Sequence, residues 1–455
     1  MQWPFSWLQI IFVLIKRTKL RRISTTPKMT EQEKQNHFSS LFKNGNYRWR
    51  ICALLFFATT INYLDRHVLS ILAPELQSNY GWSEIDYGYI VTAFQAAYGL
   101  GVILTGHLLD RFGVKLIFTI AIAVWSVAGM AHAFAKSAFS FGIARFMLGL
   151  GESANFPASI KTVAEWFPKK ERALATGIFN AGSNIGAIVS PLLVPWIAIR
   201  YGWQWAFILT GAIGFVWLVF WVMTYQRPSA HPKVTAAELA LINSDGVETS
   251  QKLGWGQVIF RKEVLTICLA RLLTDPVWWF LLYWLPKFLH KNHGITLTDI
   301  GLPLIAIYLF ADFGSIGGGW LSSRFLHKGM SLDKARKLAM LICAVCVVPI
   351  IFASQTSSLW FSVALISLAT ASHCGWMANV YTLISDIFPK KAVASVVGVS
   401  TFSAVIGSMF VATAVGYILE ITGSYFIIFS IAGFMYLLAW SIIKIGIPQI
   451  KPVKF

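Results

Sequence analysis

The sequence contains few charged residues. Only 13% of its 455 residues are Asp, Glu, Lys or Arg, about half the fraction usual in a soluble domain, whereas 56% are hydrophobic. A chain this apolar cannot hide its apolar surface in a water-soluble core, which excludes an ordinary soluble protein. Repeated apolar runs of roughly 20 residues indicate an integral membrane protein instead.

Acidic residues are scarcer than basic ones. The 20 Asp and Glu stand against 38 Lys and Arg, which gives a formal charge of +18. Such an excess could indicate nucleic-acid binding, but the basic residues lie in short loops between apolar runs, as the topology of a membrane protein requires. We therefore expect the lipid bilayer as a partner, and no nucleic acid. The loops richest in Lys and Arg also predict that both termini are cytoplasmic.

Signatures of catalysis and of metal binding are missing. The five cysteines all lie in apolar stretches, and Cys343 and Cys346 form a CxxC without a second pair or a histidine cluster. A zinc or redox centre would need those partners. The sequence also has no HExxH and no GxSxG, which argues against a membrane-embedded enzyme. We expect no metal and no cofactor.

Twelve apolar segments, bounded by charges or turn residues, predict an all-α membrane protein with twelve transmembrane helices. The first six are about 49–73, 88–109, 114–134, 138–163, 173–198 and 204–225, and the second six are about 264–289, 300–323, 335–354, 358–386, 392–419 and 424–447. The predicted organisation is an N-terminal extension and cytoplasmic segment (1–47), a six-helix bundle (48–225), a cytoplasmic linker with a surface helix (226–263), a second six-helix bundle (264–447) and a cytoplasmic tail (448–455). We interpret residues 1–28 as an upstream extension or an interfacial helix, and Met29 as a plausible first residue of the protein.

Two internal repeats support this duplicated organisation. AEWFPKKERALATG (164–177) resembles SDIFPKKAVASVVG (385–398), and GHLLDRFGVK (106–115) corresponds more weakly to GWLSSRFLHK (319–328). Each copy falls at the same turn of its half. Two parallel six-helix halves are typical of one large transporter architecture.

Ionisable residues inside apolar segments are functional candidates, because each costs several kcal/mol at bilayer depth. They fall mainly on the first, fourth, seventh and tenth segments: Asp65, Arg66, His67, Arg145, Glu152, Arg271, Asp275 and His373, with Asp312 on the eighth. If each half is an inverted repeat, these four segments are equivalent and surround one central cavity. Paired opposite charges on such helices favour a carrier, whereas a channel would show rings of like charge.

Helical spacing narrows the expected roles. Arg145 and Glu152 are seven residues apart and share a face. Asp65 and Arg66 are neighbours, about 100° apart around a helix, so they face different partners. We expect Asp65 to face Arg145, which leaves Arg66 free to bind a carboxylate with its two-pronged guanidinium.

Other polar, aromatic and small residues share faces with these candidates. Tyr63 lies one turn before Arg66, and Trp376 and Asn379 lie three and six residues after His373. A structural role is as plausible as a functional one for Arg271, Asp275 and Asp312, and His67 is left unassigned. Gly182 and Gly186 predict close helix packing.

Several motifs carry a resemblance to a known family. GHLLDRFGVK matches the signature between the second and third spans of the major facilitator superfamily at Gly106, Asp110, Arg111, Gly113 and Lys115. NYLDR, RFMLGLGESANFPAS, WFPKKER and LLTDPVWWFLLYWLPKFL resemble the anion:cation symporter family within it, and most of all bacterial hexuronate transporters. The resemblance covers about residues 48–447. In the second half Ser323 and Leu326 depart from the signature.

This resemblance implies a proton-coupled symporter in the bacterial inner membrane that imports a carboxylated sugar, a hexuronate, as a functional monomer. It further implies that Arg66 holds the substrate carboxylate, that Asp65 and Glu152 take up protons, and that Arg145 and the signature residues control gating. Sugar-contacting positions would be Tyr63, Tyr98, Trp376 and Asn379, with His373 as a further candidate on the same face. The alternative substrate is another organic anion, such as an aldonate.

Overall fold

The computed structural model describes residues 46–244 and 260–453, and within these ranges it contains helices and no strand. The expected extension of residues 1–28 and the start at Met29 lie outside the described residues. Ten of the helices are long and apolar enough to cross a bilayer, so the chain is a multi-pass membrane protein.

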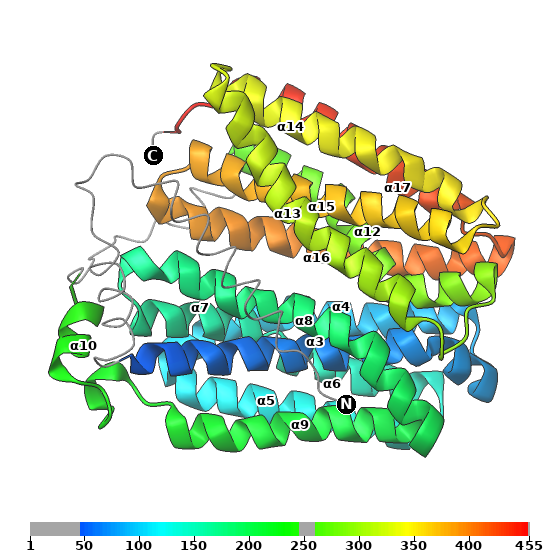
Figure 1. Cartoon of the computed structure of the whole chain (residues 1–455), viewed down its shortest axis with the longest axis horizontal. Coiled ribbons are helices and arrows are strands. Elements are labelled where there is room, and N and C mark those ends of the chain that lie inside the picture. The colour runs from blue at the N-terminus through cyan, green and yellow to red at the C-terminus, as the bar shows by residue number, and fades with distance from the viewer. Residues whose placement is uncertain (1–45, 245–259, 454–455) are drawn as a thin grey trace, which may run out of the picture.

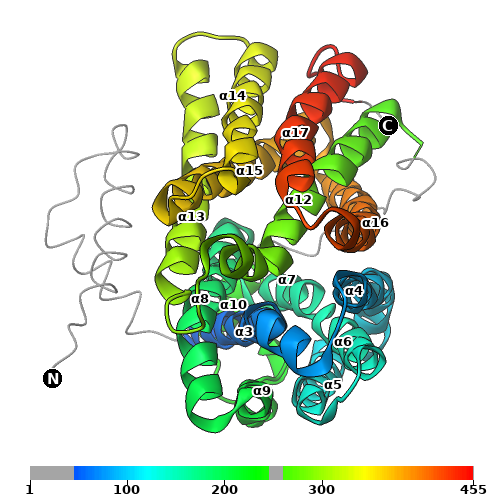
Figure 2. The same cartoon turned by 90° about the vertical axis from the view of Figure 1, so that its right-hand side faces the viewer.

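The helices form two groups, one below the other in Figure 1. The first contains α3 (Tyr47–Tyr80), α4 (Glu84–Phe112), α5 (Val114–Ala131), α6 (Ala138–Glu152), α7 (Asn155–Trp166), α8 (Lys169–Tyr201) and α9 (Trp203–Thr224). The second contains α12 (Lys262–His293), α13 (Gly301–His327), α14 (Leu332–Val347), α15 (Leu359–Ile387), α16 (Lys390–Thr422) and α17 (Phe426–Gly446). Figure 2 shows the two groups nearly end-on, with α3, α4 and α8 facing α12, α13 and α16.

Each of the twelve expected segments coincides with a helix or with two consecutive helices, but two differ from a plain apolar span. The segment 138–163 is divided at Ser153 and Ala154 into α6 and α7, and α6 has only 15 residues. The helix α3 is 34 residues long, and the stretch 61–70, which contains the charged residues, lies in the middle of its length. Neither α3 nor α6 is among the ten apolar helices.

Two ends of the molecule are distinguished below. The linker end is where α3 begins and α4 ends, and the far end is where α3 ends and α4 begins. Several contacts join the two groups toward the far end: Lys287 of α12 forms an ion pair with Glu84 of α4 at 2.5 Å, and the Tyr87 hydroxyl donates to the Tyr283 carbonyl at 2.7 Å. Gly88 and Gly416 allow α4 and α16 to approach closely, because a Cβ on Gly88 would lie 3.0 Å from the Ala412 carbonyl and one on Gly416 would lie 2.8 Å from the Glu84 carbonyl.

The linker begins with a helix that closes the start of α3. The amphipathic stretch forms α10 (Ala236–Ile242), whose buried Glu238 accepts the backbone N–H groups of Tyr47 at 3.2 Å and of Arg48 at 3.1 Å. The same carboxylate accepts from the Arg48 guanidinium at 3.2 Å. The first N–H groups of a helix have no partner within it, so an acid at this position stabilises the start of α3.

The predicted close packing of α8 is confirmed. A Cβ on Gly182 would lie 2.4 Å from the Phe56 carbonyl, and one on Gly186 would lie 2.6 Å from the Thr60 carbonyl and 2.8 Å from the Tyr63 Cβ. All three distances are shorter than the contacts that real Cβ atoms make, so only glycine fits at these two positions. The backbone of α8 therefore lies directly against α3 one turn before Arg66.

Candidate functional site

A buried ion pair joins α3 to α6 at the centre of the first group. Arg66 donates from Nε at 2.9 Å and from one terminal nitrogen at 2.8 Å to the same carboxylate oxygen of Glu152. That terminal nitrogen also lies 3.3 Å from the Asn62 side-chain oxygen. Arg66 is 3% exposed and Glu152 is fully buried, so neither charge is solvated by bulk water. The second oxygen of Glu152 has no hydrogen-bond partner among the residues that the structure describes.

Four aromatic rings surround the guanidinium of Arg66. Its carbon lies 4.7 Å from the ring centre of Tyr63, 5.2 Å from those of Phe94 and Tyr98, and 5.5 Å from that of Trp279. The rings come from α3, α4 and α12, so both groups of helices contribute. Ring faces attract cations, and this cage stabilises the guanidinium while leaving flat apolar surfaces beside it.

The expected pairing of Asp65 with Arg145 is wrong. Arg145 instead donates to the backbone carbonyl of Arg66, at 3.3 and 3.4 Å. The Asp65 carboxylate faces Thr210 of α9, and Arg145 lies near it without forming an ion pair with it. The adjacency argument holds, since the two neighbours do face different partners, but Arg66 is the one that takes an acid. We expected Arg66 to be free, but it is held by Glu152.

The candidate residues of α15 pack inside the second group. His373 stacks on Trp278 with ring centres 5.2 Å apart, and its Nδ1 lies 2.6 Å from the Tyr436 hydroxyl, which donates to the Thr274 carbonyl. Trp376 is fully buried, edge-on to Tyr436.

Asn379, the third candidate residue of α15, also packs inside the second group. Asn379 donates to the carbonyl of Gly318 on α13 at 3.0 Å. Their shared face is therefore a packing face in this conformation, away from Arg66. A spacing of three or four residues identifies a common face but not what that face meets.

A second buried arginine is held by its own acid. Arg271 donates to Asp275 at 2.7 and 3.2 Å and to the hydroxyls of Ser400 and Thr401 on α16 at 3.0 and 2.8 Å. The two bonds to Asp275 lie within α12, and the two bonds to the hydroxyls connect α12 to α16. Asp312 hydrogen-bonds with the Asn184 side chain, which joins α13 to α8 across the two groups.

The signature residues form the turn from α4 to α5 at the linker end. Gly113 has a φ of +82°, which a glycine adopts without strain, and it lets α5 start at once. The carboxylate of Asp110 accepts from Lys161 of α7 at 2.8 Å, and Arg111 lies over the Phe112 ring. A Cβ added to Gly106 would meet no atom within 4 Å, and the Lys115 carbonyl accepts from the Thr119 hydroxyl at 2.7 Å. A gating role for this turn stays a prediction.

Sequence reasoning gave no role to Phe94 and Trp279 of the cage or to Asn62 beside Arg66. Phe94 and Asn62 lie four residues before Tyr98 and Arg66, so each shares a helix face with a predicted residue, and this spacing was the available signal. Lys161 was missed because a single lysine near the end of a predicted span is an ordinary boundary residue.

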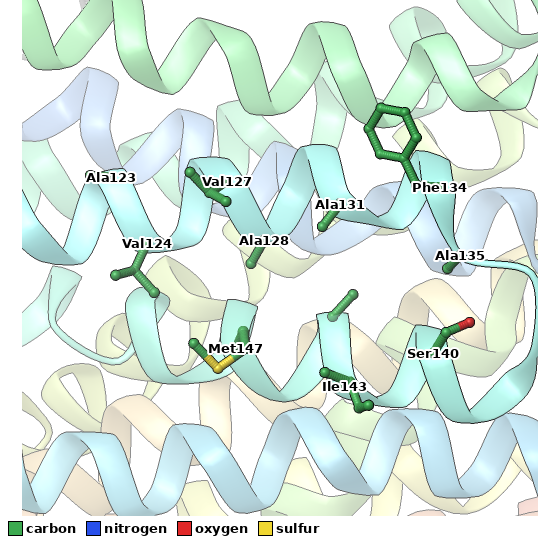
Figure 3. A pocket seen from close by; sticks show the side chains of 11 residues that line it. Ala123, Val124, Val127, Ala128, Ala131, Phe134, Ala135, Ser140, Ile143 and Met147 are labelled. Atoms are coloured by element: carbon green, nitrogen blue, oxygen red, sulfur yellow. The ribbon is translucent and has the colours of Figure 1, made fainter.

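An apolar groove of about 500 Å³ between α5 and α6 is separate from this site. Figure 3 shows its lining, which is small or apolar, with the exposed side chains of Val127, Phe134 and Ile143 on the outer surface. It has no charged side chain and faces the surroundings of the helices, as a lipid-facing surface does.

Long membrane-crossing helices around a buried, caged guanidinium define a membrane transport protein. The sequence profile of the Major Facilitator Superfamily matches residues 55–412. The chain is 33% identical over 382 residues to a hexuronate transporter of Escherichia coli, covering 83% of this chain and 88% of that protein. It is 32% identical over 402 residues to a probable galactarate/D-glucarate transporter of Bacillus subtilis, covering 84% and 88%.

The fold is similar to that of the xylose transporter of E. coli in its inward open conformation. The TM-score is 0.68 at 15% identity, covering 88% of this chain and 96% of that one. The chain belongs to the Major Facilitator Superfamily and is a transporter rather than an enzyme.

Proposed function

We propose that this chain is a symporter that imports a sugar-acid anion, a hexuronate such as glucuronate or galacturonate, together with a proton. The names of the relatives from E. coli and B. subtilis support a sugar acid as the substrate class. The observation that carries the proposal is the pair of Arg66 with Glu152 inside the aromatic cage.

This pair couples two binding events. The guanidinium that holds Glu152 has the planar geometry that binds a substrate carboxylate with two hydrogen bonds. As long as Glu152 is ionised, it occupies the N–H groups of Arg66 that would bind the substrate carboxylate. A proton on Glu152 removes its charge and releases Arg66 to the substrate, so proton and anion bind together.

The cage accounts for the sugar part of the substrate. Tyr63, Tyr98 and Trp279 are only half-buried, and their rings offer stacking surfaces to a pyranose, while tyrosine hydroxyls exchange hydrogen bonds with its hydroxyl groups. Import of an anion against a negative-inside potential costs about 2.3 kcal/mol per charge per 100 mV. Co-transport of a proton offsets this cost.

The membrane arrangement follows from the same reasoning. We infer twelve crossings, with α3 and the α6–α7 pair as the two that are less apolar, in two six-helix halves of residues 48–225 and 264–447. The linker end, with both termini, would be cytoplasmic, and the protein would act as a monomer in the bacterial inner membrane. Asp65 would take up a second proton, and Arg145 and the α4–α5 turn would control gating.

The proposal is tested by uptake into proteoliposomes with glucuronate, galacturonate, galactonate and galactarate, with and without an inward proton gradient. We expect a hexuronate to accumulate only with the gradient. Faster uptake of galactonate would establish the aldonate alternative, and accumulation without a proton gradient would overturn proton coupling.

A variant pair tests the role of Arg66. Arg66→Ala should abolish binding of the transported sugar acid, and Arg66→Lys, which keeps the charge but loses the fork, should weaken it strongly. Thermal unfolding in detergent checks that both variants are folded. Retained tight binding by the folded Arg66→Ala variant would show that the carboxylate is held elsewhere.

A further inference from the structure

The first part of the linker is bound to the linker end of the first group. After α9 the chain passes through the short helix η2 (Pro228–Ala230) and His231 to α10, which Figure 1 shows beside the start of α3. His231 is 8% exposed, and its ring centre lies 4.1 Å from that of Tyr47 on α3 and 5.7 Å from that of Trp166 on α7. We call the contacts of His231 and Glu238 with these helices the linker clasp.

Two hydrogen bonds fix the protonation state of His231. Its Nδ1 lies 3.1 Å from the backbone nitrogen of Lys233, and its Nε2 lies 3.0 Å from the carbonyl oxygen of Thr224. A backbone N–H only donates and a carbonyl only accepts, so Nδ1 accepts without a proton and Nε2 carries the hydrogen. His231 is therefore neutral when the clasp is closed. A proton added to Nδ1 would point at the N–H of Lys233 and break that bond.

A histidine at the far end is held in the opposite way. The Nδ1 of His290 lies 2.9 Å from the Ile295 carbonyl, so this nitrogen donates, and a proton on the other ring nitrogen leaves the bond intact. Histidine is the side chain that changes its charge between about pH 5 and pH 8. At His231 this change of charge costs a contact, whereas at His290 it does not.

The acids on the helices that the clasp contacts are already bound. Glu238 accepts from two backbone N–H groups of α3 and from the Arg48 guanidinium, Glu171 of α8 accepts from the same guanidinium at 2.8 Å, and Glu165 of α7 accepts from a tyrosine hydroxyl. The guanidinium of Arg50 lies 5.5 Å from the centre of the Tyr47 ring, so a second cation beside this ring would be repelled. The charged and titratable groups that these elements carry near His231 are Tyr47, Arg48, Arg50, Glu165, Glu171, Tyr225, Arg227, Lys233 and Glu238.

The bond that a proton would break holds the turn that leads into α10. Lys233 is followed by Thr235, the N-cap of α10, and then by Glu238. Because Arg48 in the first turn of α3 bonds with both Glu238 and Glu171, the clasp joins α10, α3 and α8 into one unit at the linker end. Release of α10 takes an acceptor from the start of α3, the helix that carries the site, and lengthens the unattached chain between the two groups.

We propose that His231 is a pH sensor: the linker clasp is closed and transport is fast while Nδ1 is unprotonated, and the clasp opens and transport slows when Nδ1 binds a proton. Because the open form binds this proton better, falling pH shifts the equilibrium to the open clasp and rising pH restores the closed one. With the linker end in the cytoplasm, proton import that acidifies the cytoplasm reduces its own rate. This feedback rests on the proposed symport and orientation, whereas the clasp does not.

The clasp is tested by hydrogen–deuterium exchange and mass spectrometry on the purified full-length protein at pH 8 and pH 6, with rates corrected for the intrinsic effect of pH on exchange. We expect peptides that contain Lys233 or the start of α3 to lose protection several-fold at pH 6. In His231→Asn the side-chain oxygen accepts from the N–H two residues on without titrating, so protection should be equal at both pH values. The control His290→Asn should keep the pH dependence of the wild type. Equal protection of the wild type at both pH values, or a pH dependence that survives in His231→Asn, would overturn the sensor.

The effect on transport is tested by exchange of labelled galacturonate across proteoliposomes with the same pH on both sides, which needs no proton gradient. Between pH 8 and pH 6 the exchange rate of the wild type should fall several-fold more than that of His231→Asn. An equal fall in both proteins would overturn the regulatory role. If the wild type exchanges galacturonate but accumulates none under a proton gradient, the symport and the feedback fail, and the exchange rates still decide whether the clasp regulates transport.

Discussion

Replacing Glu152 by Gln removes the charge that competes with the substrate for Arg66. At a charge separation of about 4 Å and an effective dielectric constant of about 20, the attraction between the two side chains is about 4 kcal/mol. A substrate carboxylate must overcome this attraction when Glu152 is ionised, but not when it is protonated. Binding should therefore be tight at low pH and weaken as pH rises.

The magnitude follows from one proton per substrate. Where the empty protein has Glu152 ionised, each pH unit costs about 1.4 kcal/mol, or tenfold in Kd. Kd stops rising with pH once the full attraction of about 4 kcal/mol has been overcome, which corresponds to a roughly thousandfold weaker affinity. In Glu152→Gln the fork has no charged competitor, so Kd should stay near its low-pH value throughout.

The assay is equilibrium binding of galacturonate to purified protein between pH 5.5 and pH 9, read by calorimetry. Asp275→Asn is the matched control, because it removes a buried acid that also holds an arginine, Arg271, yet lies outside the cage. The control should keep the pH slope of the wild type. An unchanged slope in Glu152→Gln would refute the competition and transfer the coupling to another acid, with Asp65 as the next candidate.

Two further predictions concern stability and are read by thermal unfolding in detergent. Gly186→Ala should destabilise the protein by about 1–3 kcal/mol, because the new Cβ would overlap the Thr60 carbonyl. The control Gly177→Ala on the same helix places its Cβ in open space and should be neutral or slightly stabilising. Equal unfolding temperatures of the two variants would show that α8 can move away from α3. Glu238→Ala should cost about 1–3 kcal/mol, because the first backbone N–H groups of α3 lose their acceptor and the Arg48 guanidinium keeps Glu171 but loses its second acid. An unchanged unfolding temperature in that variant would mean that another group takes the place of the carboxylate.

The positions of the helices could be predicted because bilayer thickness fixes the length of an apolar run. Each expected segment falls on a helix, and the packing of Gly182 and Gly186 follows from their spacing alone. The break between α6 and α7 was not predicted, although the sequence carried a signal for it. It occurs in the polar run GESA, and Pro157, the third residue of α7, has no N–H to donate to the preceding turn, so proline is favoured in the first turn of a new helix.

Pairing partners were the part of the site that sequence could not decide. Helical spacing shows that Asp65 and Arg66 face different directions, but two acids and two arginines allow more than one pairing. The choice depends on the rotation of α6 relative to α3, which glycines on α6 help to set: a Cβ on Gly149 would lie 2.4 Å from the Phe94 carbonyl of α4. Close packing of α6 on α4 thus decides which residue Glu152 reaches.

The division of labour between the two groups of helices has a consequence for coupling. The first group supplies Arg66 and Glu152, whereas the second supplies Trp279 to the cage and Lys287 to the far-end contact. Both of these residues are on α12, about two turns apart, so a rotation of α12 as one body would open the far end and move one wall of the cage together. A substrate bound between Arg66 and Trp279 would change the energy of that rotation directly. Substrate binding and opening are therefore linked through a single helix, and no separate relay between them is required.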